Sequence, residues 1–242
     1  MDWFEKIKKP IIALAPMHGY TYSEFRQKCA KAGADAVYSE MVASEAIIRD
    51  VPQAMEMLGF EQNERPVILQ IFGSNSEVMA KAAQIIEERF SPDGIDINFG
   101  CPVQKAAKQG FGSCQLADDS EAAKIVKAVC SATSIAVSVK MRLVSFDANE
   151  NIDFIKKMHQ AGARLFSVHG RIRTQKYRGH ADWNLLRKIK QGCGDIPILG
   201  SGDVDSLQFL KDNLGNLDGA LVGRAAKRDP EIFGELVKIK ND

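Results

Sequence analysis

Short apolar runs alternate with longer amphipathic stretches from one end of the chain to the other. Within each run, hydrophobic and polar residues do not strictly alternate, which is typical of parallel strands that are buried on both faces. Each run is bounded by Gly, Pro or a cluster of polar residues. The pattern predicts strands at 11–16, 36–41, 67–72, 94–100, 135–141, 165–169, 196–199 and 219–222.

The stretches between these runs have the spacing of amphipathic helices. Thr21 and Glu24 have the spacing of a capping box, so a helix is expected to begin near Tyr22. Pro52 is expected to break or kink the second helix. The predicted helices span 22–33, 44–58, 76–90, 120–133, 150–161, 183–190, 206–213 and 230–238.

This succession amounts to roughly eight strand–helix units, which is the count of a (β/α)8 TIM barrel. A doubly wound open sheet is the structural alternative. The barrel is favoured because the units are evenly spaced and no G-x-G-x-x-G motif opens the first helix. We therefore expect one α/β domain over residues 1–242.

Composition excludes several classes of protein. The chain is 45% hydrophobic and 26% charged, so it can bury a full core, and its net charge of +1 gives no overall attraction to nucleic acid or membrane. Its five cysteines include no C-x-x-C pair and no zinc spacing, which predicts reduced thiols and no metal. The charged N-terminus and the lack of a long apolar run predict a cytoplasmic protein with no membrane partner.

Polar side chains follow nearly every predicted strand. A single Lys140 could be a surface lysine, and a single His169 could be a core histidine. In a TIM barrel, however, the carboxyl ends of the strands form the active-site face, so a polar group at most of these ends indicates a functional site. The strand-end residues are Pro16, Met17, His18, Glu40, Gln70, Asn98, Cys101, Lys140, Arg142, His169, Arg171, Ser201, Gly202, Asp203, Gly223 and Arg224.

Cys101 follows a buried strand and lies between Gly100 and Pro102, where the chain must turn. This is where an α/β enzyme would place a reactive side chain. Cysteine is also a common small core residue, so its position alone leaves both interpretations open.

The residues at the ends of the seventh and eighth predicted strands indicate a phosphate-binding site. Gly200, Gly202 and Gly223 allow backbone N–H groups to approach an anion, and Arg224 adds a positive charge. Barrel phosphate sites commonly form after strands seven and eight. The combination suggests a ligand that carries phosphate.

The segment 171–183 is strongly basic and contains Tyr177. It is either a solvated loop or a docking surface for a polyanion, with an aromatic ring that could stack on a base. Its basic residues, together with those elsewhere on the expected catalytic face, are Arg171, Arg173, Lys176, Arg178, Lys105, Lys108 and Arg142.

These residues resemble the tRNA-dihydrouridine synthase family, and the resemblance extends over nearly the whole chain. The matching segments occur in the family's order, and the fourth and sixth are the most specific. They are LAPMHGYTYSEFR, SEMVAS, LQIFGS, DINFGCPVQKAAKQGFGS, VKMR, VHGRIRTQKYRGHADW, GSGDV and GRAA.

The resemblance implies a TIM barrel that binds FMN. Lys140 would lie at the pyrimidine edge of the flavin, and Arg224 with the 201–203 turn would hold its phosphate. Asn98, Arg171 and Tyr177 would face the target uridine. The implied flavin contacts are Pro16, Met17, His18, Gln70, Lys140, His169, Ser201, Gly202, Asp203, Gly223 and Arg224.

The implied reaction is reduction of the 5,6 double bond of uracil in tRNA. NADPH would reduce FMN, a hydride would pass from FMN to carbon 6, and Cys101 would act as the general acid that protonates carbon 5. A thiol suits this role because its ordinary pKa of about 8.5 keeps it protonated at neutral pH.

The chain departs from the family pattern at three points. Ser201 stands where the family usually has Asn, and His18 stands where it usually has a small or acidic residue. The family's C-terminal helical tRNA-binding domain is expected to be absent. The sequence could be a truncated piece, a natural short form, or a chain that uses a partner protein to bind RNA.

Two further functions compete with tRNA reduction. One is an FMN-dependent reductase of a small free pyrimidine or enone. The other is a flavin-containing RNA-binding protein with little turnover, which would have no need of Cys101, Lys140 and His169.

Overall fold

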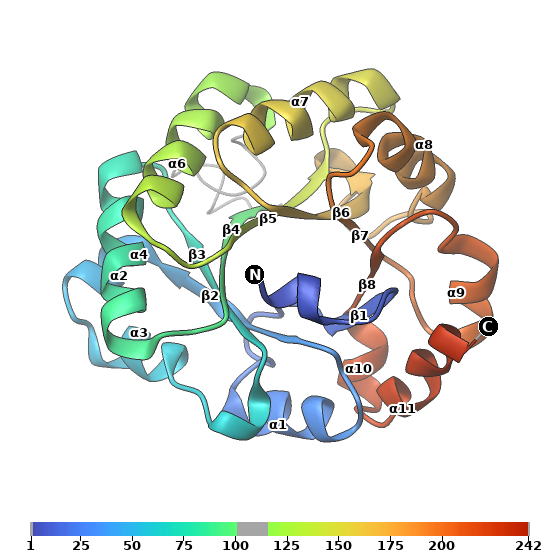
Figure 1. The fold of residues 1–242 in the computed structure, drawn as a ribbon, viewed down its shortest axis with the longest axis horizontal. Coiled ribbons are helices and arrows are strands. Elements are labelled where there is room, and N and C mark those ends of the chain that lie inside the picture. The colour runs from blue at the N-terminus through green and yellow to red at the C-terminus, as the bar shows by residue number, and fades with distance from the viewer. Residues whose placement is uncertain (1, 101–115, 242) are drawn as a thin grey trace.

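The computed structural model describes residues 2–100 and 116–241, and its strands form one closed parallel barrel in chain order (Figure 1). The predicted (β/α)8 TIM barrel is therefore confirmed, and the open doubly wound sheet is excluded. The strands are β1 (Ile11–Leu14), β2 (Val37–Ala43), β3 (Val67–Phe72), β4 (Gly94–Phe99), β5 (Val137–Leu143), β6 (Leu165–Ile172), β7 (Ile198–Ser201) and β8 (Gly219–Val222).

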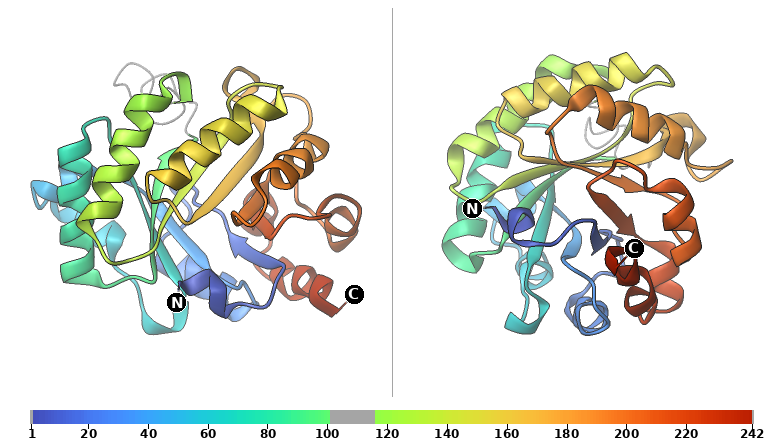
Figure 2. Two further views of the ribbon diagram at one scale, coloured as in Figure 1. Left: turned by 45° about the horizontal axis from the view of Figure 1, so that its top comes forward. Right: turned by 45° about the vertical axis from the view of Figure 1, so that its right-hand side comes forward.

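The helices surround the barrel, as the two views in Figure 2 show. They are α1 (Ser23–Lys31), α2 (Ser44–Ile48), α3 (Pro52–Leu58), α4 (Ser76–Phe90), α6 (Asp119–Ala132), α7 (Ala148–Gln160), α8 (Trp183–Cys193), α9 (Leu207–Asn213), α10 (Arg224–Arg228) and α11 (Ile232–Leu236). Short 3₁₀ turns are η1 (Trp3–Lys6), η2 (Gln62–Glu64), η4 (Arg173–Gln175) and η5 (Val237–Asn241).

The barrel closes where β1 pairs with β8. Residues Ile11 to Leu14 pair in register with Gly219 to Val222. Gly219 has a φ of +158°, and a Cβ at this position would lie 2.0 Å from the Ile11 carbonyl oxygen. Only glycine therefore allows the two strands to approach closely enough for the ring of hydrogen bonds to close.

Helix boundaries follow local chemistry in most places. The Asn75 side chain accepts hydrogen bonds from two N–H groups at the start of α4, and Asp118 does the same for α6. The expected capping box of Thr21 is wrong, because Tyr22 is the N-cap of α1. The Thr21 side chain is fully buried, and its hydroxyl bonds instead to the backbone of Met17, where it closes the β1–α1 loop.

Prolines account for two further boundaries. The expected break at Pro52 is confirmed, since α2 ends at Ile48 and α3 begins at Pro52. The single final helix expected over 230–238 is wrong, because α11 and η5 divide that stretch and α10 lies before it. Asp229 precedes Pro230 and is extended (φ −152°, ψ 107°), because proline disfavours helical geometry in the residue before it.

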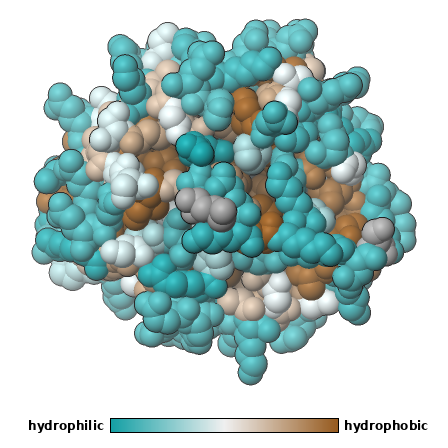
Figure 3. All heavy atoms as spheres, in the orientation of Figure 1, coloured by the Kyte–Doolittle hydropathy of each residue, from teal (hydrophilic) through white to brown (hydrophobic). Residues whose placement is uncertain are grey.

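The N-terminal turn η1 lies across the middle of the barrel opening in Figure 1. Trp3 and Phe4 are buried there, and the Trp3 ring meets Tyr38 edge to face with 6.5 Å between centroids. A Cβ on Gly94 would lie 2.8 Å from Trp3 Nε1, so glycine makes room for the indole. In the same orientation, hydrophilic atoms cover most of the surface and hydrophobic atoms are visible between them (Figure 3).

A buried ion pair holds the β1–α1 loop. Arg26 Nε lies 2.5 Å from Glu64 Oε2, and both side chains are almost completely buried. The same guanidinium donates to the carbonyl oxygens of Thr21 and Gly59, so it links the loop before α1 to the segment after α3.

We expect Glu64→Gln to lower the free energy of unfolding by about 3 kcal/mol, because it leaves the buried Arg26 charge uncompensated. Denaturant unfolding measures this change. Glu121→Gln is the matched control, since Glu121 pairs with Lys124 on the exposed face of α6 and its loss should leave stability almost unchanged. Equal effects of the two substitutions would contradict the role given to the buried pair.

Candidate active site

The carboxyl ends of the strands open onto a cavity of about 810 Å³. This volume is within the range of small-molecule and cofactor sites. The structure brings together every described residue that the family resemblance implies for flavin or uridine contact. Those that line the cavity are Pro16, Met17, His18, Gln70, Asn98, Lys140, His169, Arg171, Tyr177, Ser201, Gly202, Asp203, Gly223 and Arg224. The predicted general acid Cys101, like Lys105 and Lys108 of the basic set, lies outside the described residues.

A chain of side-chain hydrogen bonds runs along β3 and β4 into this cavity. Gln70 Nε2 donates to Asp96 Oδ2 at 2.7 Å, and Asn98 Nδ2 donates to Gln70 Oε1 at 2.8 Å. Asn98 Oδ1 then accepts from the backbone N–H of Gly100 at 3.0 Å. Asp96 belongs to one of the specific family segments but was not among the predicted site residues, because the sequence does not show that it contacts Gln70.

His169 is neutral in this site. Burial lowers the pKa of its imidazole to about 2, and the positive charges of Lys140, Arg142 and Arg171 act in the same direction. Arg171 Nη1 lies 3.1 Å from His169 Nε2. Because a guanidinium can only donate, Nε2 is the accepting nitrogen and Nδ1 carries the proton.

Arg171 is almost fully buried in the wall of the cavity, with 1% of its surface exposed. Its guanidinium donates to the carbonyl oxygens of Arg178 and Gly179 and to both carboxylate oxygens of Asp203. These bonds hold the β6–α8 loop onto the turn after β7. Arg171 therefore supports the site from beneath the loop.

The turn after β7 has backbone conformations that suit glycine. Gly202 has a φ of +114°, and a Cβ there would lie 2.7 Å from Ala181 Cβ and 3.1 Å from His169 Nε2. Asp203 follows with a φ of +62°. Glycine thus allows the turn to pack directly against the His169 ring.

The Asp203 carboxylate joins three segments of the site. It accepts from the Ala181 N–H at 2.7 Å, from Arg171, and from Arg224 Nη2 at 2.6 Å. Burial alone would raise the pKa of Asp203, but the Ala181 N–H and the two arginines hold that pKa below its usual value. The carboxylate is therefore ionised at neutral pH.

Tyr177 stands at the rim of the cavity with 64% of its surface exposed. The guanidinium carbons of Arg142 and Arg224 lie 5.7 and 5.8 Å from the centroid of its ring. Both distances are within the range of cation–π contacts. The ring is thus held at the mouth and remains largely exposed to solvent.

His18, which differs from the residue that the family usually has at this position, contacts Glu40. Its Nδ1 lies 3.4 Å from Glu40 Oε2, and the same carboxylate accepts from the Gly19 N–H. Glu40 lies where the β2–β3 pairing shifts register, between Tyr38 and Met41. The acid from β2 therefore holds the loop after β1.

Helix α10 contributes cations that sequence analysis missed. Lys227 and Arg228 line the cavity beside Arg224. Lys227 Nζ lies 2.5 Å from Tyr20 Oη and 3.8 Å from the centroid of the Tyr20 ring. Tyr20 and Lys227 are 207 positions apart, so no local pattern could have paired them.

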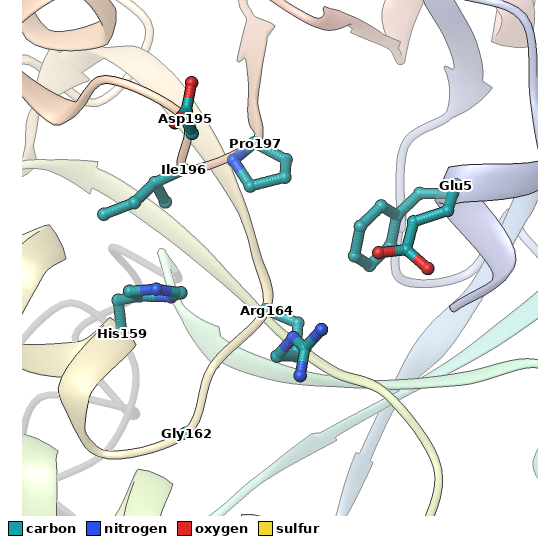
Figure 4. Close-up of a pocket in the computed structure, with 8 residues that line it drawn as sticks. Glu5, His159, Gly162, Arg164, Asp195, Ile196 and Pro197 are labelled. Carbon is teal, nitrogen blue, oxygen red and sulfur yellow. The ribbon is translucent and has the colours of Figure 1, made fainter. Parts of the chain in front are cut away.

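A second, smaller cavity of about 550 Å³ lies at the opposite end of the barrel, beside η1 and the starts of β6 and β7. Its charged side chains, Glu5, Arg164 and Asp195, are spread around the opening (Figure 4). They come from segments that precede the strands, away from the strand ends where barrel enzymes place their chemistry.

Comparison with known proteins supplies the family. The sequence profile described as "Dihydrouridine synthase (Dus)" matches residues 13–242. The chain belongs to the dihydrouridine synthase family. The resemblance noted from the sequence motifs is thereby confirmed.

Two relatives show how far the dihydrouridine synthase likeness extends. The chain is 36% identical over 241 residues to "Probable tRNA-dihydrouridine synthase" of Aquifex aeolicus, which covers 97% of this chain and 75% of the relative. It is also 36% identical over 228 residues to "tRNA-dihydrouridine synthase B" of Pseudomonas putida, covering 93% of this chain and 67% of the relative.

A solved structure supports the fold of this dihydrouridine synthase family member. A complex of 2-naphthoyl-CoA reductase with 2-naphthoyl-CoA superposes with a TM-score of 0.69 at 11% identity, over 96% of this chain and 50% of the other. At this identity the likeness concerns the fold alone.

Among residues 2–100 and 116–241, every helix falls short of the length and apolar character needed to cross a membrane. Within the same ranges, no three His, Cys, Asp or Glu side chains are grouped so that they could hold a metal ion.

The neutral His169 predicts a dependence of stability on pH. Below pH 6.5 the unfolded chain takes up a proton that the folded protein excludes, so folding loses stability as the pH falls. This group alone should contribute about 1.4 kcal/mol per pH unit between pH 6 and pH 4. Above about pH 8, where the imidazole is neutral in both the folded and the unfolded state, it should contribute nothing.

Denaturant unfolding at several pH values would measure this slope in wild type and in His169→Gln. We expect a shallower slope in the variant. The matched control is His180→Gln, because His180 is exposed. A wild-type slope in His169→Gln would contradict a buried neutral imidazole.

Proposed function

We propose that this chain is a flavin-dependent tRNA-dihydrouridine synthase, which reduces uridine in tRNA to 5,6-dihydrouridine with NADPH as the reductant. Residues 1–242 would act as a single FMN-binding catalytic domain in the cytoplasm. The main support is the family match over residues 13–242, together with one cavity that collects every described residue expected to contact flavin or uridine.

The residues of the cavity fit FMN. One side, at the ends of β7 and β8, has the cations Arg224, Lys227 and Arg228, which suit a phosphate. The other side, at the ends of β3 to β6, has amides, a lysine and a neutral imidazole, which suit the carbonyl and nitrogen edge of a flavin ring. A ligand with a phosphate at one end and a polar ring at the other would match both sides.

At the phosphate side, we propose that Arg224 and the 201–203 turn hold the anion, with Gly223 giving backbone access. Ser201 can offer one hydroxyl where the family's usual asparagine offers an amide. Asp203 would orient Arg224 through the 2.6 Å bond between them.

At the ring side, we propose that Gln70, Lys140 and His169 contact the flavin, with Pro16, Met17 and His18 from the β1 end. Lys140 supplies a positive charge beside the pyrimidine edge. His169 remains neutral and offers its Nδ1 proton as a donor, because Arg171 occupies Nε2.

FMN, when bound, supplies the hydride that goes to carbon 6 of uracil, and NADPH renews it. Cys101 would donate the proton to carbon 5; this assignment rests on the family resemblance of the segment that contains it. Asn98 and Tyr177 would contact the uridine. Arg171 lines the cavity and would help to place the uridine, both from the cavity wall and through the loop that it holds.

We propose the exposed side of the β6–α8 loop as the docking surface for tRNA. Arg173, Lys176 and Arg178 are exposed there, and Tyr177 lies among them. Removing the target uridine from its stack costs a few kcal/mol, which phosphate contacts could offset.

An anaerobic experiment tests the proposed reaction. The protein-bound flavin is reduced with NADPH, unmodified bulk tRNA is added, and reoxidation is followed by absorbance. We expect fast reoxidation with dihydrouridine formed in the tRNA. Reoxidation by a free pyrimidine or enone, but not by tRNA, would instead identify a small-molecule reductase, and no reoxidation by either would contradict both.

Replacement of Cys101 tests the general acid. We expect Cys101→Ala to retain FMN and to lose uridine reduction by about 10²-fold or more, the usual contribution of a positioned acid. Cys130→Ala, a free cysteine on α6, is the matched control and should keep normal turnover. Normal turnover of Cys101→Ala would rule out the assignment.

The docking surface predicts a strong effect of salt. Phosphate contacts release counterions, so tRNA affinity should fall steeply between about 50 and 200 mM salt. Filter binding of Arg173→Ala, Lys176→Ala and Arg178→Ala should each show weaker binding and a smaller salt slope. Lys81→Ala, on the outer helix α4, should match wild type. A flat salt response in wild type would exclude this surface.

A further inference from the structure

The hydrogen-bond chain below the cavity has one direction. Asp96 is fully buried inside the barrel, where its carboxylate accepts from Gln70 Nε2 at 2.7 Å and from Ser138 Oγ at 2.6 Å. At the other end, the backbone N–H of Gly100 donates to Asn98 Oδ1 at 3.0 Å. Two side-chain amides, Gln70 and Asn98, lie between these ends.

The chemistry of the two ends determines how both amides are turned. An ionised carboxylate can only accept, and a backbone N–H can only donate. Gln70 must therefore present Nε2 to Asp96 and Oε1 to Asn98. Asn98 must in turn present Nδ2 to Gln70 and Oδ1 to Gly100. If either amide were reversed, two donors or two acceptors would face each other in a buried place, and these polar groups would lose their hydrogen bonds.

We propose that Asp96 is a positioning residue that fixes the amide orientations of Gln70 and Asn98 in the active site. It touches neither ligand itself. It acts through Gln70, which is 1% exposed, and then through Asn98, both of which line the cavity.

The orientation matters for recognition. A reversed amide exchanges a donor for an acceptor at nearly the same position, so it changes which ligand atoms the residue can bind. The functional half of the proposal is that these amide orientations affect ligand binding. It rests on the proposed function, in which Gln70 contacts the flavin and Asn98 the uridine. The structural half concerns the protein alone and can be tested without either ligand.

Asp96 also has an ionisation that can be followed. Burial raises the pKa of its carboxyl to about 6, opposed by the hydrogen bonds from Ser138 and Gln70 and by the charge of Lys140 on β5. Among the described residues, the Tyr38 hydroxyl on β2 also faces it. The carboxylate is thus ionised at pH 7.5 and becomes a weaker acceptor below pH 6.

Nuclear magnetic resonance of the side-chain amides tests the structural half. Asp96→Leu removes the acceptor at similar side-chain size, and we expect the NH₂ signals of Gln70 and Asn98 and the N–H signal of Gly100 all to move. Asp96→Asn should restore much of the wild-type pattern, because its amide oxygen can accept from Gln70 while the Ser138 hydroxyl turns to accept from its nitrogen.

Ser138→Ala is the matched control. It removes one hydrogen bond to Asp96 but leaves the carboxylate as the acceptor for Gln70, so Asn98 and Gly100 should keep their signals. If Asp96→Leu does not fold, a pH titration of the wild-type protein replaces it. The Gln70, Asn98 and Gly100 signals should then shift together with one midpoint near pH 6.

A change at Gln70 that leaves Asn98 and Gly100 unmoved would overturn the proposal. The functional half is measured by binding of FMN to the apoprotein through quenching of flavin fluorescence. We expect Asp96→Leu to raise the dissociation constant about threefold to tenfold, with recovery in Asp96→Asn. Moved amide signals with unchanged FMN affinity would overturn the link to flavin binding and count against the Gln70 contact, while the positioning of the amides would stand.

Discussion

Closure of the barrel between β1 and β8 is the constraint on which the site depends. The pairing of Ile11 with Gly219 brings the first and last strands side by side, and a Cβ at residue 219 would collide with the Ile11 carbonyl. Once the ring is closed, all eight carboxyl ends face one mouth. Residues more than 200 positions apart, such as Met17 and Arg224, then line the same cavity.

Several positively charged side chains line the mouth of the barrel, and a carboxylate pairs with two of them. Asp203 accepts from both Arg171 and Arg224, so one carboxylate orients two guanidiniums. His169 adds no charge, since burial and the neighbouring cations keep it neutral. Positive charge remains both at the exposed rim, at Arg224, and inside the cavity, at Lys140, Arg142 and Arg171. A cavity rich in positive charge agrees with the proposed use of a phosphate-bearing cofactor and an RNA substrate.

Which residues lie in the site could largely be predicted from the sequence, but the contacts that each of them makes could not. Gln70, Lys140 and His169 were placed correctly at the mouth, because strand ends can be located from apolar runs and Gly or Pro boundaries. Arg171 was expected to face the substrate; it lines the cavity, and it lies almost fully buried beneath the β6–α8 loop. Its position could not be deduced, because it depends on the loop folding back over its own strand.

The sequence by itself determined the number of strand–helix units, the fold and the residues at each strand end, because those properties follow from local patterns of burial and turn residues. Family motifs added the expected chemistry. Only the tertiary structure decided which side chains meet: Asp203 with two arginines, Lys227 with Tyr20, and Asp96 with Gln70 and then Asn98. These contacts join residues that are distant in the chain, and their geometry exists only after the barrel has closed.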